Sequence, residues 1–156
     1  MKRQHLTAWV ACALVLISLM AAGLPSRSAA ASPSAAAVVQ TYFTIANGIL
    51  RGESASGLAS VFAPDAMLTA ANPKGAVTTV HGIAAITAWY KAWAAGAMPG
   101  TQLTPTSMRI PAPDTVIHYE IAGSAAKPLI ARCAHIFVVQ GGRIVSDDFI
   151  VFFRAA

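Results

Sequence analysis

The stretch LIARCAHIFVVQGGRIVSDDFIVFF, residues 129–153, decides the fold of this chain. Two runs rich in β-branched and aromatic residues flank Gly141-Gly142, and glycine supplies the positive φ angles that a two-residue hairpin turn requires. The sequence therefore predicts a β-hairpin whose strands cover 129–139 and 143–153. A turn of this length places Val139 opposite Ile144 and, further along, His135 opposite Asp148.

The segments before this hairpin predict two more strands, three helices and a short strand pair. Val38, Tyr42, Ile45 and Ile49 recur at helical spacing, which indicates a helix that ends at Arg51-Gly52. The other expected elements are helices over 55–62 and from Gly82 to Gly96, and strands over 67–70, 77–80, 103–110 and 115–122. This order predicts an α+β domain with helices against one face of a curved, mostly antiparallel sheet.

The first 31 residues read as a secretory signal peptide. Lys2 and Arg3 precede an uncharged apolar run over 8–24, and small alanines follow at 29–31. We expect cleavage near residue 31, a linker over 32–36, and a domain over 37–154 in a secreted or periplasmic protein. An uncleaved membrane anchor is the alternative.

Composition narrows the classes of function. The chain has 156 residues, of which 56% are hydrophobic and only 11% charged, which excludes a disordered protein. Loss of Lys2, Arg3 and Arg27 with the signal leaves eight basic against six acidic residues, so the net charge falls from +5 to +2. No basic surface for nucleic acid is expected. The remaining Cys133 is expected to be buried and inert.

The order of these motifs resembles the NTF2-like superfamily, in particular its SnoaL-like members and the ketosteroid isomerases. The residues that carry the likeness are the first helix, LASVFAPDA at 58–66, His81-Gly82 and Gly141-Gly142-Arg143-Ile144. The resemblance covers about residues 35–153. It implies a cone-shaped α+β barrel with an apolar cavity between helices and sheet, and often a homodimer. It implies no single reaction, because this fold serves many chemistries.

The carboxyl groups of the ketosteroid isomerases have no counterpart here. No Asp or Glu lies between Asp65 and Asp114, and the position of the second isomerase acid falls on Ala134. Ketosteroid isomerisation by the known route is therefore not expected.

Strand alternation and the resemblance assign the candidate catalytic residues. Asp147 is the carboxylate of the last hairpin predicted to point into the cavity, where burial suits it to hold or move a proton. The alternative places it at the cavity mouth, solvated or paired with Arg132 or Arg143. Tyr42 and Tyr90 are candidate hydrogen-bond donors to a ligand oxygen, or ordinary core aromatics.

His135 and Asp148 form an alternative acid–base pair. The predicted register places both on the outer face of the sheet, as a structural or interface pair, and a one-residue bulge in the hairpin would reverse this assignment. His118 and Glu120 are also expected to point outward. The predicted cavity lining comprises Ile45, Trp89, Ile117, Tyr119, Ala134, Ile136, Phe149 and Val151.

The sequence is consistent with three functional hypotheses. The leading one is a domain that binds a small, mostly apolar molecule bearing one or two oxygens. The second is a cofactor-free proton-transfer enzyme that uses Asp147 with Tyr42 or Tyr90, and the third is a homodimerisation module without a ligand. The spacing of the histidines indicates no metal site, and no motif indicates a nucleotide or other cofactor.

Overall fold

The computed structural model describes residues 32–154, which fold into an α+β domain; the predicted signal peptide lies outside the described residues. The helices are α2 (Ala35–Leu50), the 3-10 turn η1 (Ala55–Gly57), α3 (Leu58–Val61) and α4 (Ile83–Ala95). The strands are β1 (Phe62–Ala71), β2 (Val77–His81), β3 (Gln102–Ala112), β4 (Thr115–Gly123), β5 (Ala131–Gln140) and β6 (Arg143–Arg154). The predicted elements are confirmed in type and order, although β1 begins earlier than expected, directly after α3.

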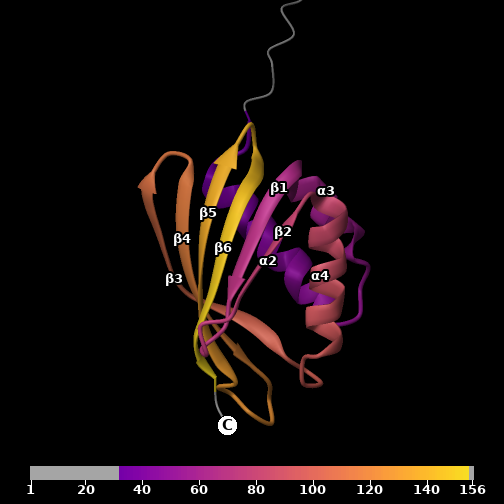
Figure 1. Ribbon diagram of the computed structural model, residues 1–156. Helices are drawn as coiled ribbons and strands as arrows, with labels where there is room; N and C mark the ends of the chain where they lie inside the picture. The colour runs from indigo at the N-terminus through magenta and orange to yellow at the C-terminus, as the bar shows by residue number, and fades with distance from the viewer. Residues whose placement is uncertain (1–31, 155–156) are drawn as a thin grey trace, which may run out of the picture. The chain divides into compact units, whose positions relative to one another are not determined.

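The six strands form one sheet in the order β2-β1-β6-β5-β4-β3 (Figure 1). Strands β1 and β6 pair in parallel, and every other neighbouring pair is antiparallel. The last strand therefore lies at the centre of the sheet, between β1 and β5. This position between two strands leaves β6 no exposed edge, although Ile150 and Phe152 remain exposed on its outer face.

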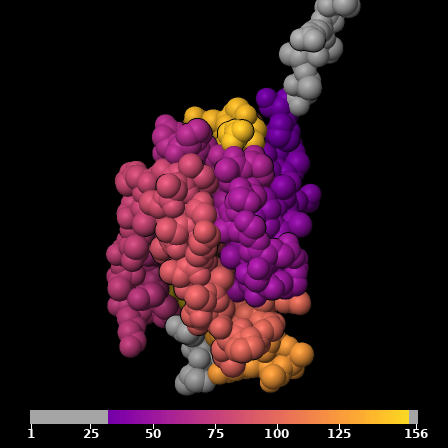
Figure 2. All heavy atoms as spheres, turned by 90° about the vertical axis from the view of Figure 1, so that its right-hand side faces the viewer, coloured from indigo at the N-terminus to yellow at the C-terminus, as the bar shows by residue number. Residues whose placement is uncertain are grey.

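The helices cover one face of this sheet. Helix α2 contacts β3, β4, β5 and β6, whereas α4 contacts β1 and β2. The two helices lie side by side on the outside of the molecule (Figure 2). Ser34 caps α2 by accepting a hydrogen bond from the backbone N–H of Ala37. Within residues 32–154, no helix is long and apolar enough to cross a membrane.

The core lies between the helices and the sheet and is rich in aromatic side chains. Helix α2 contributes the stripe predicted from its spacing, with Val38, Tyr42 and Ile49 buried. Tyr90 from α4 and Phe137 from β5 meet this stripe from the two sides, and both are fully buried. The apolar spacing of the first helix thus correctly predicts which of its faces is buried.

The hairpin turn between β5 and β6 has the predicted geometry, but the register beyond it differs. Gly141 and Gly142 have φ values of 55° and 75°, and Val139 lies opposite Ile144 as expected. The next pair is Val138 with Ser146, so Val145 is an extra residue in β6.

This bulge moves the pairs from Val138–Ser146 to Cys133–Val151 by one position. His135 consequently lies opposite Phe149, and Asp148 lies opposite Ile136. The predicted pairing of His135 with Asp148 is wrong because no bulge was assumed.

The bulge reverses the predicted faces of β5 and β4. Phe137 shares the inner face with Asp147, and so does His135, two residues away. His118 is the partner of His135 in β4, so His118 and Glu120 point inward and are buried. The inward orientation expected for four residues is therefore wrong, and these residues lie on the outer face: Ile117, Tyr119, Ala134 and Ile136.

Candidate functional site

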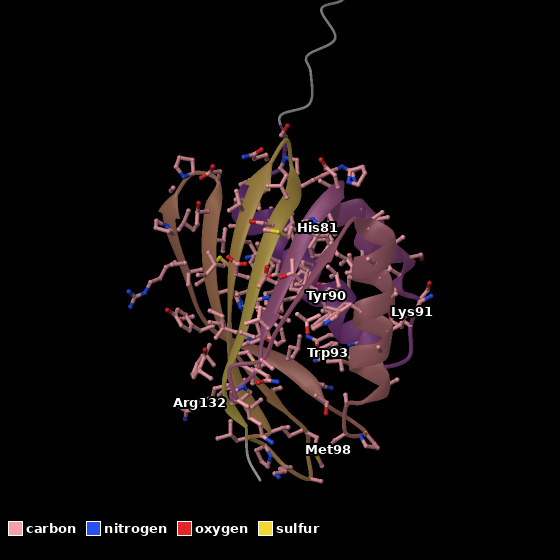
Figure 3. The ribbon with its side chains drawn as sticks, viewed as in Figure 1. His81, Tyr90, Lys91, Trp93, Met98 and Arg132 are labelled. Carbon is pink, nitrogen blue, oxygen red and sulfur yellow. The ribbon has the colours of Figure 1, made fainter. Side chains whose placement is uncertain are left out.

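Two tyrosines from different helices meet in the core. Tyr42 projects from α2 and Tyr90 from α4, and their hydroxyl oxygens lie 2.7 Å apart. Figure 3 shows Tyr90 and Trp93 pointing from α4 toward the sheet, while Lys91 points away from it. Burial raises the pKa of both phenols well above 10, and the negative charge of Asp147 raises them further. Both hydroxyls are therefore protonated and act as donors.

Asp147 of β6 receives hydrogen bonds from two of the surrounding side chains. His135 Nδ1 lies 2.8 Å from Asp147 Oδ1, and the Tyr90 hydroxyl donates to Asp147 Oδ2 at 3.4 Å. Because Tyr90 has a single hydroxyl hydrogen, Tyr42 donates to the Tyr90 oxygen. The expected alternative, in which Asp147 is solvated or paired with Arg132 or Arg143, is wrong, because Asp147 is fully buried.

The ring of His135 is held between two aromatic rings. Phe137 stacks on it with centroids 5.0 Å apart and an interplanar angle of 4°, and Phe149 stacks at 4.5 Å and 25°. With Nδ1 bound to Asp147, the opposite nitrogen, Nε2, lies 3.5 Å from Glu120 Oε1. His135 thus lies between two carboxylates.

Glu120 is buried without a hydrogen-bond partner. It is 2% exposed, and neither of its carboxylate oxygens has a hydrogen-bond partner among residues 32–154. The distance of 3.5 Å from His135 Nε2 is too long for a strong charge-assisted hydrogen bond, so the contact is mainly electrostatic. The two carboxylates on His135 therefore have different surroundings, since Asp147 is hydrogen-bonded and Glu120 is not.

The charge state of His135 follows from these neighbours. Burial lowers the pKa of His135, but the attraction of Asp147 and Glu120 exceeds this effect and raises the pKa to about 10. Burial raises the pKa of Asp147 above its ordinary value, and the charge and hydrogen bond of His135 offset this rise only in part. The site is therefore an imidazolium between the carboxyl groups of Asp147 and Glu120. Tyr90 donates a hydrogen bond to Asp147, and Tyr42 donates one to Tyr90.

A cavity of about 380 Å³ lies next to this cluster, between α4, the end of β1 and the inner face of β4–β6. Its walls are mostly apolar, with seven alanines and the aromatic side chains of Trp89, Trp93 and Phe149 among the lining residues. Glu120 lines the cavity, and it also lines a narrow gap beyond it that is bordered by Tyr42, Tyr90 and His135. The gap has no room for a water molecule. Of Glu120, Tyr42, Tyr90 and His135, only Glu120 therefore lines the space that is open to a ligand.

A family model for the SnoaL-like domain matches residues 39–147. The chain belongs to the SnoaL-like family. No curated protein matches the sequence significantly.

Solved structures similar to this SnoaL-like domain share its fold at low sequence identity. An NTF2-like protein of unknown function from Mesorhizobium loti is 20% identical with a TM-score of 0.60, over 77% of this chain and 92% of its own. A Catenulispora acidiphila protein with a ketosteroid isomerase-like fold, in complex with trimethylamine, is 23% identical with a TM-score of 0.56. The match covers 72% of this chain and 82% of that protein. A proposed polyketide cyclase from Sinorhizobium meliloti is 21% identical with a TM-score of 0.56, over 72% and 93%.

The SnoaL-like domain brings some of the predicted site residues together. Asp147, Tyr42 and Tyr90 form one hydrogen-bonded chain, as their predicted inward orientation requires. Of the predicted lining residues, Trp89, Phe149 and Val151 line the cavity. Ile45 packs beside Gly57 in the core instead, and the others lie on the outer face: Ile117, Tyr119, Ala134 and Ile136.

Glu120 is the site residue that the sequence analysis placed on the wrong face. In β4 the apolar Ile117, Tyr119 and Ile121 alternate with His118 and Glu120, and apolarity favoured the first set as the inner one. The structure shows the reverse. The signal that could have identified Glu120 is the ionisable residues themselves, because placing His118, Glu120, His135 and Asp147 on one face brings opposite charges together.

His118 is a second buried polar residue beside this cluster. Its ring stacks on Phe43 with centroids 4.0 Å apart, and Nδ1 has no hydrogen-bond partner in the described part of the chain. Burial lowers the pKa of His118, and the charge of His135 lowers it further although Glu120 opposes this. His118 is therefore uncharged at neutral pH. Among residues 32–154, no group of three or more His, Cys, Asp or Glu side chains has the geometry for a metal ion.

Proposed function

We propose that this SnoaL-like domain binds a small, mostly apolar molecule in its cavity and catalyses a cofactor-free proton transfer on it. The observation that supports this most directly is Glu120, a buried carboxylate that lines an apolar cavity and whose oxygens have no hydrogen-bond partner among residues 32–154. A carboxylate held out of water and next to an imidazolium is suited to accept a proton and to return it.

The residues around Glu120 have distinct roles in this proposal. Glu120 is the catalytic residue, because it is the acid–base group that lines the cavity. His135 Nε2 faces the Glu120 carboxylate at 3.5 Å, and Asp147 fixes the ring and charge of His135. Tyr42 and Tyr90 complete the hydrogen bonds of Asp147. The catalytic role expected of Asp147 thus passes to Glu120, and Asp147 becomes a positioning residue.

The proposal is tested by hydrogen exchange at carbon. In D₂O, the wild-type domain should incorporate deuterium beside the carbonyl of a ring ketone; suitable probes are cyclohexanone and N-methyl-4-piperidone, which have similar shapes. Glu120→Gln should reduce this exchange at least about a hundredfold, the usual scale for loss of a general base. Glu53→Gln is the matched control, because Glu53 is exposed and bound to Arg51. Exchange that survives in Glu120→Gln would refute the role of Glu120.

Binding without chemistry is the second candidate function. It is favoured by the cavity lining, in which the aromatic and aliphatic walls outnumber groups that could stabilise a charged intermediate. If the wild-type domain binds either ketone, detected by the fluorescence of Trp89 and Trp93, but exchanges no hydrogen above the buffer rate, this second function holds and catalysis is rejected.

We also propose that the protein is exported and acts as a homodimer. The basic start, apolar run and small residues of segment 1–31 support export, and Ser34, which caps α2, follows the expected cleavage point. Apolar side chains on the outer face of the sheet support self-association, because Ile150 and Phe152 are exposed there.

A further inference from the structure

The charge of the cavity wall is carried by one residue. Among residues 32–154, Glu120 is the only Asp, Glu, Lys, Arg or His side chain that lines the cavity. The Cys133 thiol also lines it, but burial and the charge of Glu120 raise the pKa of this thiol to about 12, so it is neutral. A buried carboxylate is costly unless a positive group or hydrogen-bond donors compensate it.

The protein itself compensates Glu120 only in part. The single positive charge of His135 is shared by two carboxylates, and its shorter contact, 2.8 Å, goes to Asp147 rather than to Glu120 at 3.5 Å. Tyr90 also donates to Asp147. The positive group therefore lies closer to Asp147, and the buried carboxylate oxygens without a hydrogen-bond partner among residues 32–154 belong to Glu120, which lines the cavity.

Aromatic rings line the cavity around this carboxylate. The indole rings of Trp89 and Trp93 are parallel within 7° with centroids 6.3 Å apart, and Phe149 meets Trp89 edge-on at 6.0 Å. All three residues line the cavity together with Glu120. The faces of aromatic rings, indole above all, attract cations, and more strongly where water is excluded.

We propose that the cavity binds a small organic cation, an ammonium compound whose positive nitrogen lies beside Glu120 and whose apolar groups contact Trp89 and Trp93. The inference rests on the proposed ligand cavity but not on catalysis. A neutral hydroxyl would give Glu120 one hydrogen bond and leave its charge uncompensated, whereas an anion would be repelled. A cation satisfies the carboxylate and the aromatic walls at once.

The wild-type protein tests this with three probes of nearly equal shape. Choline, 3,3-dimethylbutan-1-ol and 3,3-dimethylbutanoate carry charges of plus one, zero and minus one on similar branched skeletons. We expect choline to bind at least about tenfold more tightly than the alcohol, and the carboxylate to bind most weakly, by calorimetry and tryptophan fluorescence. Equal or tighter binding of the alcohol, or no binding of choline at its highest soluble concentration, would overturn the proposal.

Two variants assign the preference to Glu120. Glu120→Gln keeps the shape of the side chain and removes its charge, so the ratio of choline to alcohol affinity should fall close to one. Glu53→Gln, at an exposed site, should keep the wild-type ratio. A cation preference that persists in Glu120→Gln would contradict the role assigned to this carboxylate, and the wild-type comparison stands even if that variant does not fold.

Failure of this inference and failure of the proposed function give different results. If the alcohol binds as well as choline while Glu120→Gln still abolishes hydrogen exchange into cyclohexanone, the cation is rejected and the acid–base role stands. If choline is preferred but neither ketone exchanges, the domain binds cations without catalysis. Preferential exchange into N-methyl-4-piperidone, which is protonated at neutral pH, would support both.

Discussion

Glu120 and Asp147 flank the same imidazole, and the difference between their surroundings separates their roles. Asp147 is fully buried, and each of its carboxylate oxygens accepts one hydrogen bond, from His135 and from Tyr90. Glu120 lines the cavity, and its oxygens have no hydrogen-bond partner in the part of the chain that the structure describes. In the proposed function, Glu120, whose oxygens accept no hydrogen bond from residues 32–154, acts on the ligand. Asp147, whose oxygens do accept hydrogen bonds, holds the ring of His135 in place. Hydrogen bonding rather than depth of burial thus decides, in the proposed function, which carboxylate reacts.

The raised pKa of His135 predicts how stability depends on pH. The folded domain keeps the His135 proton to about pH 10, whereas an unfolded chain loses it near pH 6.5. The stabilisation is therefore complete below about pH 6.5 and is lost as the pH rises toward 10. We expect the free energy of unfolding to fall across this range by up to about 1.4 kcal/mol per pH unit. Urea unfolding at a series of pH values measures it.

Two neighbouring aspartates provide the control for this pH dependence. Asp147→Asn removes the charge that holds the His135 proton and should flatten the slope between pH 6.5 and 10. Asp148→Asn changes the adjacent residue, which lies opposite Ile136 on the outer face, and should leave the slope unchanged. A slope that is equally steep in Asp147→Asn and wild type would show that His135 is not its source.

Among the secondary-structure elements, the hairpin between β5 and β6 contains two glycines whose surroundings differ. Both have positive φ, 55° at Gly141 and 75° at Gly142, which fits a type I′ turn. Nothing lies within 4 Å of a Cβ placed on Gly141, whereas one on Gly142 would lie 2.8 Å from Pro33 Cδ. The second glycine is therefore required both by its backbone angle and by the chain that precedes α2.

This difference predicts opposite outcomes for two substitutions in the turn. Gly141→Asn should change the free energy of unfolding by less than about 0.5 kcal/mol, because Asn tolerates this conformation and is favoured at the first turn position. Gly142→Ala should lower it by about 1–2 kcal/mol from backbone strain, with a further loss from the displacement of Pro33. Chemical denaturation compares the two. Equal losses would contradict the contact with Pro33.

The same hairpin shows which parts of the structure follow from sequence. The turn, the order of elements and the inner face of β6 were predicted correctly, because they depend on local glycines and on apolar residues at Phe149 and Val151. The inner faces of β5 and β4 were not, because one extra residue, Val145, moves the register. A bulge of one valine among other β-branched residues has no local signature in the sequence. The change of register that it causes in β5 also changes which residues of β4 face inward, because β4 pairs with β5.

Apolarity could not correct this error, because both faces of β4 carry apolar residues. Ile117, Tyr119 and Ile121 lie on the outer face, where the usual alternation rule expects polar side chains. The inner face instead carries His118 and Glu120, which the acid–base cluster requires. The site was therefore hidden for a physical reason: its charged residues occupy the positions that an ordinary core would fill with apolar ones.

At the scale of the whole molecule, the sheet is apolar on both faces, and only one of them is covered by helices. The outer face contains Ile117, Tyr119 and Ile136, which are half-buried, and Ile150 and Phe152, which are 39% and 54% exposed. Residues of this kind on neighbouring strands form a continuous apolar surface, which a second copy of the domain would cover.

We therefore expect the domain to be a dimer through this face. Size-exclusion chromatography with light scattering should give twice the mass of one chain at micromolar concentration. Phe152→Lys should shift the mass toward the monomer, because a charge within an apolar interface is costly to bury. Val77→Lys is the control, since Val77 is more exposed, at 61%, but begins the edge strand β2.

The affinity for choline tests whether the outer face of the sheet and the cavity act independently. Because the outer face and the cavity lie on opposite sides of the sheet, monomeric Phe152→Lys should keep the wild-type affinity for choline. A wild-type protein that is monomeric at micromolar concentration would reject the dimer while leaving the cavity intact. A monomeric Phe152→Lys variant that also loses choline would instead show that the second copy holds the cavity in its binding shape, through the strands β5 and β6 that carry both faces.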